Sequence, residues 1–265
     1  MRKYFLIFFI VMAVTTALSC ITLLFINPAF DDVVIGFSTL LFMAVILLYY
    51  LGMIVCSIGS NVVIAVRFYK SCYTDEGYLT HTLPVNSNQL LIGKTIAYFL
   101  FSLIMGALMV LSVLLIIGTG FAHFGTFVDL SSIDFSELTV AMKEETGIDL
   151  IPFILFLIVY CIVISLANIL IITGCISIGQ LMSKHRILGA LLAYFGFYMI
   201  VQIVSTFASI PMTTSILKAE LSGTTMTMWE VLGPVYLLVG GLYVVIAAIM
   251  YFINIHMMTK RLNLE

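Results

Sequence analysis

The chain has 265 residues, of which 63% are hydrophobic and only 9% are charged, with a formal net charge of −2. This composition excludes a soluble globular protein, and we expect no nucleic-acid partner. The connections between the apolar runs are too short to hold a soluble domain, so residues 1–265 are predicted to form a single transmembrane domain.

Six long runs of the chain contain no Asp, Glu, Lys or Arg. Each run exceeds the roughly 20 residues that a helix needs to cross a hydrocarbon core of about 30 Å. The runs are continuously apolar without strict alternation, which is typical of helices rather than of barrel strands. The predicted fold class is therefore an all-α integral membrane protein with six transmembrane helices. The predicted spans cover residues 4–26, 33–66, 95–121, 150–181, 188–211 and 232–256.

Positive charge gathers at one set of span ends. If the helices cross alternately, nine of the eleven Lys and Arg residues lie on one side, which leaves only Lys143 and Lys218 on the other. Ten of the thirteen acids lie on the side of these two lysines. Cytoplasmic connections of membrane proteins carry an excess of Lys and Arg, so the side with nine is predicted to be cytoplasmic, with both termini inside.

The longest connection on that side is the 67–94 segment, which reads RFYKSCYTDEGYLTHTLPVNSNQLLIGK. Thr74 can cap a helix whose first turn holds Asp75 and Glu76, two carboxylates that are favourably placed at the positive end of the helix dipole. Pro84 ends this element because proline cannot donate the backbone hydrogen bond that a helix needs. The segment thus predicts a short cytoplasmic helix of about two turns between the second and third spans.

This short helix needs a surface to pack against, because two turns are not stable alone in water. Leu79 and Leu83 are four residues apart and would share its apolar face. Its acids are poorly suited to an anionic lipid surface, so docking into a partner protein is favoured over lying on the headgroups. Asn86 then favours the start of the helix that forms the third span.

The 67–94 segment resembles the loop between the second and third spans of type 2 ATP-binding-cassette (ABC) exporter permeases from Gram-positive bacteria. In that family FYK, DEGYLT and TLPV recur in this order before a helix that opens with QLL. The resemblance implies that residues 75–83 form a coupling helix in a groove of a separate ATPase subunit. It also implies a bacterial plasma membrane and a second permease chain, identical or related, that completes the transport path. The implied partner-binding residues are Asp75, Glu76, Tyr78, Leu79, Thr82 and Leu83.

The predicted function is that of the membrane-spanning permease subunit of such an exporter. Ion-coupled carriers usually need an ionisable group near the middle of the membrane, and the six runs contain no Asp, Glu, Lys or Arg. Energy would therefore come from ATP hydrolysis by the separate subunit, and a largely apolar path would suit an amphipathic cargo such as a peptide or a lipid. The alternative is a non-transporting membrane scaffold or sensor subunit that docks a cytosolic partner through the same segment.

The chain shows no motif for a reaction of its own. Residues 88–95 match the end of a Walker A loop, but Asn88 stands where glycine is needed and no strand precedes it. ATP and Mg²⁺ are therefore expected on the partner subunit. The four His and five Cys residues have no metal-ligand spacing, so we expect neither an enzyme nor a metal site in this chain.

Outside the cytoplasmic connection, a few polar positions carry predictions. Residues 131–147 suggest a short surface helix on the acidic side, with Gly147 as its stop. Asn168 and Gln202 are candidates for the substrate path, because they lie furthest from a span end. The polar side chains considered within the spans are Asn61, Asn168, Gln180, Gln202 and Asn254.

Overall fold

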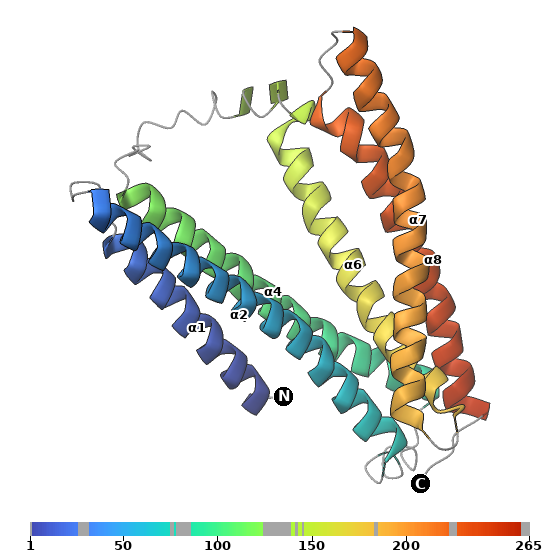
Figure 1. The fold of residues 1–265 in the computed structure, drawn as a ribbon. Coiled ribbons are helices and arrows are strands. Elements are labelled where there is room, and N and C mark those ends of the chain that lie inside the picture. Colours follow the sequence, from blue (N-terminus) through green and yellow to red (C-terminus); the bar gives the residue numbers. More distant parts are fainter. Residues whose placement is uncertain are drawn as a thin grey trace. The chain divides into compact units, whose positions relative to one another are not determined.

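A computed structural model describes residues 2–25, 32–74, 77, 86–123, 139–140, 143–144, 146–182, 185–222 and 227–260. These residues are almost entirely helical (Figure 1). The long helices are α1 (Arg2–Phe25), α2 (Asp32–Tyr73), α4 (Ser87–His123), α6 (Leu150–Gly179), α7 (Arg186–Ser222) and α8 (Met228–Lys260). All six contain a stretch that is long and apolar enough to cross a membrane. The prediction of a helical chain with six such helices is confirmed.

Several helices extend beyond the predicted spans. α2 continues past residue 66 to Tyr73, and α4 begins at Ser87 rather than at residue 95. α7 continues through Pro211 to Ser222. Hydrophobicity marks the part of a helix that suits lipid, whereas polar residues can prolong the helix beyond it. The start of α4 directly after Asn86, whose carbonyl accepts a hydrogen bond from the amide of Leu90 at 3.1 Å, is as predicted.

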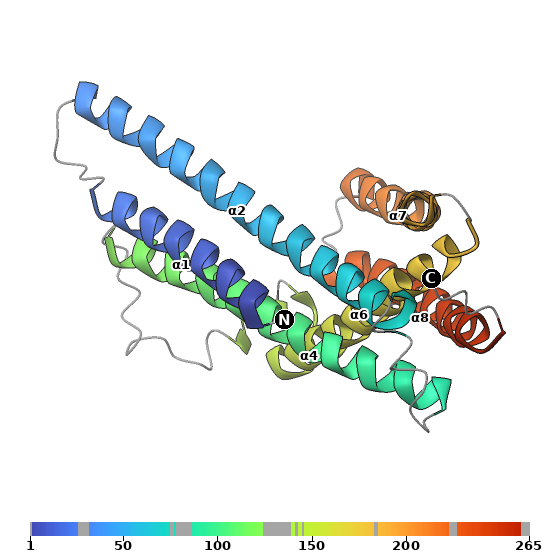
Figure 2. The ribbon, with the colours of Figure 1, turned by 90° about the horizontal axis from the view of Figure 1, so that it is seen from below.

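The chain forms two compact units, and the first comprises Met1–Ile64 and Leu100–Ile133. In this unit α1 lies along α2 and α4 (Figure 1 and Figure 2). A Cβ at Gly52 of α2 would lie only 3.1 Å from the Cγ2 atom of Thr15 in α1, so these helices approach closely. The hydroxyls of Tyr49 and Ser112 are 2.7 Å apart and join α2 to α4. Small residues and interhelical hydrogen bonds of this kind hold helices together in lipid.

The second unit comprises Ala65–Phe99 and Asp134–Glu265. In it α6, α7 and α8 pack against one another. A Cβ at Gly174 of α6 would lie 2.6 Å from the Sδ atom of Met250, so α6 and α8 are in close contact. The buried hydrophobic cluster between these two helices consists of Ile171, Cys175, Ile246 and Met250.

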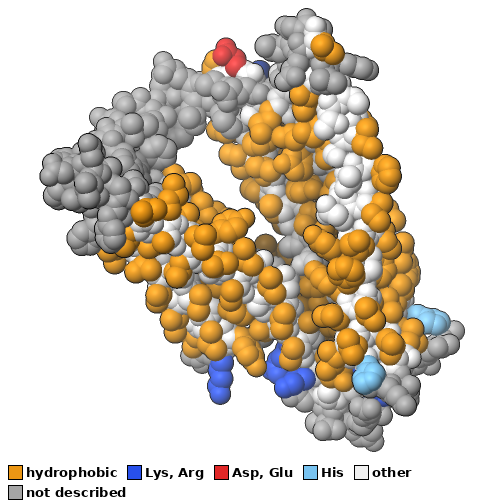
Figure 3. Space-filling view, in the orientation of Figure 1, with side chains coloured by type: hydrophobic (Ala, Val, Ile, Leu, Met, Phe, Trp, Pro, Cys, Tyr) orange, Lys and Arg blue, Asp and Glu red, His pale blue; other side chains and the backbone are white. Residues whose placement is uncertain are grey.

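Hydrophobic side chains cover the sides of the helices, whereas the visible Lys and Arg side chains lie at helix ends (Figure 3). Leu155, Leu237 and Phe252 are 63%, 63% and 69% exposed. Apolar side chains this widely exposed would cause aggregation in water, but they are well solvated by lipid. The exterior therefore agrees with a multi-pass membrane protein.

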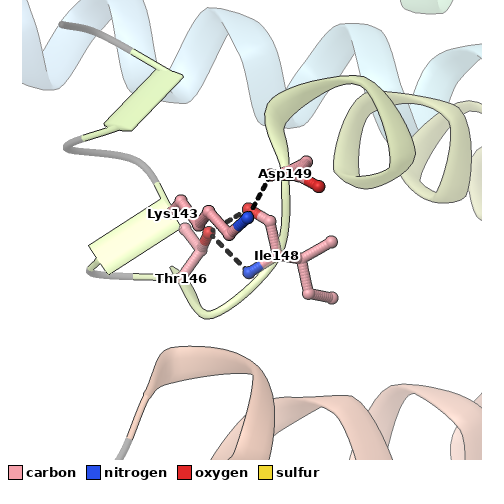
Figure 4. Close-up of polar contacts among 4 residues, drawn as sticks. All are labelled: Lys143, Thr146, Ile148 and Asp149. Carbon is pink, nitrogen blue, oxygen red and sulfur yellow. Dashed lines mark hydrogen bonds and ion pairs between the residues drawn. The ribbon is translucent and has the colours of Figure 1, made fainter.

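A tight turn leads into α6 (Figure 4). Thr146 Oγ1 donates to the carbonyl of Ile148 at 3.0 Å, and Lys143 Nζ lies 3.0 Å from Asp149 Oδ1 in an exposed ion pair. Gly147 has a φ of 80°, a left-handed conformation that favours glycine, and its amide donates to the carbonyl of Lys143 at 2.9 Å. Gly147 thus ends a helical turn as predicted, whereas most of the predicted surface helix lies outside the described residues.

Candidate functional site

The 67–94 segment is described in part, as residues 67–74, Gly77 and residues 86–94. The partner-binding residues predicted in it lie outside the described residues and stay predictions. They are Asp75, Glu76, Tyr78, Leu79, Thr82 and Leu83. The described residues on either side nevertheless show how the segment is attached to the helices.

The chain leaves α2 through a turn that requires glycine. Thr74 Oγ1 donates to the carbonyl of Lys70 at 2.6 Å, so this hydroxyl closes the end of α2, and its role as cap of a following helix stays a prediction. The amide of Gly77 donates to the carbonyl of Thr74 at 2.6 Å. A Cβ on Gly77 would lie 2.6 Å from the carbonyl oxygen of Cys72, a distance that side chains do not adopt. A larger residue at position 77 would therefore force this turn open.

A lysine ties the two flanking helices together. Lys94 of α4 donates from Nζ to the carbonyl of Ser71 at 2.9 Å, and the same atom lies 3.0 Å from Cys72 Sγ. Ser71 belongs to the last turn of α2, where backbone carbonyls lack partners within the helix. The positive charge of Lys94 at this position also interacts favourably with the negative end of the α2 dipole.

The end of α2 is further joined to α6 and α8 by four polar side chains, which we name the Tyr73 network. Tyr73 donates to Ser177 Oγ at 2.8 Å, and Ser177 donates to Asn254 Oδ1 at 2.6 Å. Asn254 donates from Nδ2 to Thr173 Oγ1 at 3.2 Å, and Thr173 donates to the carbonyl of Ile169 at 2.9 Å. The hydroxyls of Ser177 and Thr173 each accept one of these hydrogen bonds and donate another, whereas the Tyr73 hydroxyl only donates. The network therefore connects three helices and ends on a backbone carbonyl.

The Tyr73 network is closed off from its surroundings. Thr173, Ser177 and Asn254 are fully buried, and Tyr73 is 2% exposed. The ring of Phe68 contacts the ring of Tyr73, with centroids 6.2 Å apart, and Phe68 is itself fully buried. Buried hydrogen bonds that cannot be replaced by water are costly to break.

A second link runs from α8 to the start of α4. The hydroxyl of Tyr251 donates a hydrogen bond to Asn88 Oδ1. Tyr251 and Asn254 are three residues apart on α8 and therefore lie on the same side of that helix. Through these two residues α8 contacts both flanks of the 67–94 segment, namely α4 directly and α2 through Ser177.

Sequence reasoning did not identify this network. It included Asn254 among the polar residues of the spans, but it selected Asn168 and Gln202 for their distance from the span ends. In the structure Asn168 is half-buried on α6 and Gln202 is exposed on α7, and their assignment to a substrate path stays a prediction. The spacing of Thr173 and Ser177, four residues apart on α6, was the available signal for a polar face.

The arrangement is suited to holding helices together rather than to a reaction. The Tyr73 network consists of hydroxyls, an amide and backbone carbonyls. Within the described ranges, no group of three or more His, Cys, Asp or Glu side chains could hold a metal ion.

Comparison with known proteins gives no match, either to a family model, to a curated protein or to a solved structure. The resemblance of the 67–94 segment to ABC exporter permeases therefore stays a prediction from sequence.

Proposed function

We propose that this chain is the membrane-spanning permease subunit of an ABC exporter, located in a bacterial plasma membrane with both termini in the cytoplasm. It moves an amphipathic cargo, peptide or lipid-like, with energy from ATP hydrolysed by a separate subunit that also holds the ATP and Mg²⁺. The observation that carries the proposal is the attachment of the 67–94 segment to the helices on both of its sides. Lys94 ties α4 to α2, and Tyr73 ties α2 to α6 and α8.

The charge distribution supports an external source of energy. The apolar runs within the six helices contain no Asp, Glu, Lys or Arg, so ion or proton coupling lacks the group that it usually needs near the middle of the membrane. Six long apolar helices support a membrane path, and the Lys and Arg bias supports placing the 67–94 segment on the ATP-containing side.

The scaffold or sensor alternative uses the same segment without transport. The permease and the scaffold differ in how cargo affects a bound ATPase and in the number of chains in the complex. A permease stimulates ATP hydrolysis when cargo is present. It works as two permease chains with two ATPase chains, so that the transport path runs between two sets of apolar helices. A scaffold binds its partner without either property.

The test is the variant Leu79→Asp, which places a charge on the predicted docking face of the coupling helix. Its matched control is Leu130→Asp, the same change in the connection predicted to lie outside the cell. Both chains should reach the membrane at normal abundance, because no span is altered. Leu79→Asp should lose the ATPase subunit on purification, whereas Leu130→Asp should keep it. Retention of the ATPase and of peptide- or lipid-stimulated hydrolysis by Leu79→Asp would refute the proposed docking site.

A further inference from the structure

The geometry points to α8 as the helix that receives movement from the 67–94 segment, through two attachment points, Asn254 and Tyr251. Asn254 connects α8 to the end of α2 through Ser177 and Tyr73, and Tyr251 connects it to the start of α4 through Asn88. This inference rests on the proposed function for the origin of the movement, but the attachments themselves do not.

The first step concerns which helix a displacement of the 67–94 segment would move. Tyr73 is the last residue of α2, directly before the turn at Thr74. A loop that was free at its ends would yield on its own when a partner moved it. Here the residue next to the turn is buried and hydrogen-bonded to another helix, so the turn cannot move without either breaking that bond or displacing Ser177.

The second step concerns the strength of the connection. The links from Tyr73 to Ser177 and from Ser177 to Asn254 lie among side chains that exclude water. If such a bond breaks, the groups stay unpaired, and this cost favours movement of the joined helices together. α6 is part of the same connection, because Ser177 lies on it and Gly174 packs against Met250 of α8.

The third step concerns the two points at which α8 is attached. The hydrogen bonds that leave α2 and α4 toward the C-terminal helices end on α6 and α8 in the described part of the chain. α8 is linked to the start of α4 by Tyr251 and, through Ser177, to the end of α2 by Asn254, and these two positions lie on one side of the helix. A displacement of the segment would thus act on α8 at two points and would tilt or shift the part of the helix that carries them.

Removing two phenolic oxygens tests the attachments without changing side-chain shape. The variant is Tyr73→Phe combined with Tyr251→Phe. The matched control is Tyr69→Phe combined with Tyr243→Phe on the same two helices, since these hydroxyls form no hydrogen bond among the described residues. The measurement is hydrogen–deuterium exchange of the full chain in lipid nanodiscs. In the test variant the amides of residues 70–74 and 86–90 should exchange roughly three- to tenfold faster, as expected for loss of one interhelical bond at each site.

The transmission is measured on the complex with the ATPase subunit, with and without a non-hydrolysable ATP analogue. In the wild type and in the control, the analogue should change the exchange of α8 amides around residues 246–258. In the Tyr73→Phe/Tyr251→Phe variant the ATPase should still co-purify, because the docking residues are intact, but the response of α8 should be lost.

Each result decides one part. Unchanged exchange at residues 70–74 and 86–90 in the test variant would refute the attachments. A full response of α8 in that variant would refute the transmission while leaving the proposed function in place. Failure of the wild-type chain to bind any ATPase would overturn the proposed function and the transmission with it, and the exchange data on the chain alone would still decide the attachments.

Discussion

Replacing Gly77 by alanine should open the turn through which the chain leaves α2. The added Cβ would lie 2.6 Å from the carbonyl oxygen and 2.7 Å from the carbonyl carbon of Cys72. Ordinary van der Waals contact begins at 3.4 Å, so residue 77 and the carbonyl oxygen of Cys72 would have to move apart by about 0.8 Å to reach it. Cys72 cannot yield easily, because it is fully buried and its neighbour Ser71 is held by Lys94.

The size of the effect follows from this crowding. Forcing an extra carbon into a packed site costs about 1–3 kcal/mol, and the gain from alanine in a helical turn is about 1 kcal/mol at most. The net cost of about 1–2 kcal/mol would reduce the population of the native turn roughly fivefold to thirtyfold. The predicted docking residues lie on both sides of Gly77, so binding of a partner should be weakened more than the fold is destabilised.

Gly93→Ala is the matched control in the same segment. Gly93 lies inside α4, and a Cβ there would meet no atom within 4 Å. The same substitution should therefore stabilise the chain by up to about 1 kcal/mol through helix propensity.

The assay compares the two variants by unfolding in detergent titrations and by co-purification of the ATPase subunit. Gly77→Ala should unfold earlier and bring down less ATPase, and Gly93→Ala should do neither. If Gly77→Ala proved as stable as Gly93→Ala and kept its partner, the tight turn at Cys72 would not exist as described.

Two further predictions concern packing and orientation. Gly179→Ala should destabilise the chain by about 1–3 kcal/mol, because its Cβ would lie 2.5 Å from the backbone nitrogen of Ala190 in α7. In the control Gly196→Ala the new Cβ meets no atom within 4 Å, so this variant should be neutral or stabilising in the same detergent titration. Equal effects of the two substitutions would argue against the close approach of α6 and α7. In intact cells, a cysteine introduced at Glu145 should react with an impermeant thiol reagent and one introduced at Lys184 should not, and labelling of the second would reverse the orientation drawn from the Lys and Arg bias.

The helical architecture was predictable because lipid imposes it on the sequence. A run that crosses the hydrocarbon must satisfy its own backbone and must be apolar for its full length, so six charge-free runs identify six helices. The same rule does not locate helix ends. Arg67 and Lys70 are charged and lie beyond the apolar run, yet both belong to α2. Near such a boundary, hydrophobicity and helix formation are separate properties.

The links between helices were not predictable in the same way. Asn168 and Gln202 were chosen because they lie furthest from the ends of their spans. Whether a side chain is buried, however, depends on which residues of neighbouring helices it contacts. Asn254 lies nearer the end of its span, and it is fully buried because Ser177 and Thr173 of α6 face it. Nothing in a single sequence pairs position 254 with position 177, or Tyr73 with either.

The two ends of α6 and α8 are held by contacts of different kinds. At one end Ser177 and Asn254 form hydrogen bonds, which depend on distance and direction. At the other, Phe156 packs edge-on against Trp229 with ring centroids 4.9 Å apart, and Tyr160 packs against Tyr236 at 5.5 Å. Ring contacts of this kind tolerate a range of offsets and angles, so they yield to a small sliding movement where a hydrogen bond would break. A displacement that enters at the Tyr73 network would therefore move α6 and α8 together at that end, and relative movement between the two helices would be taken up at the aromatic end.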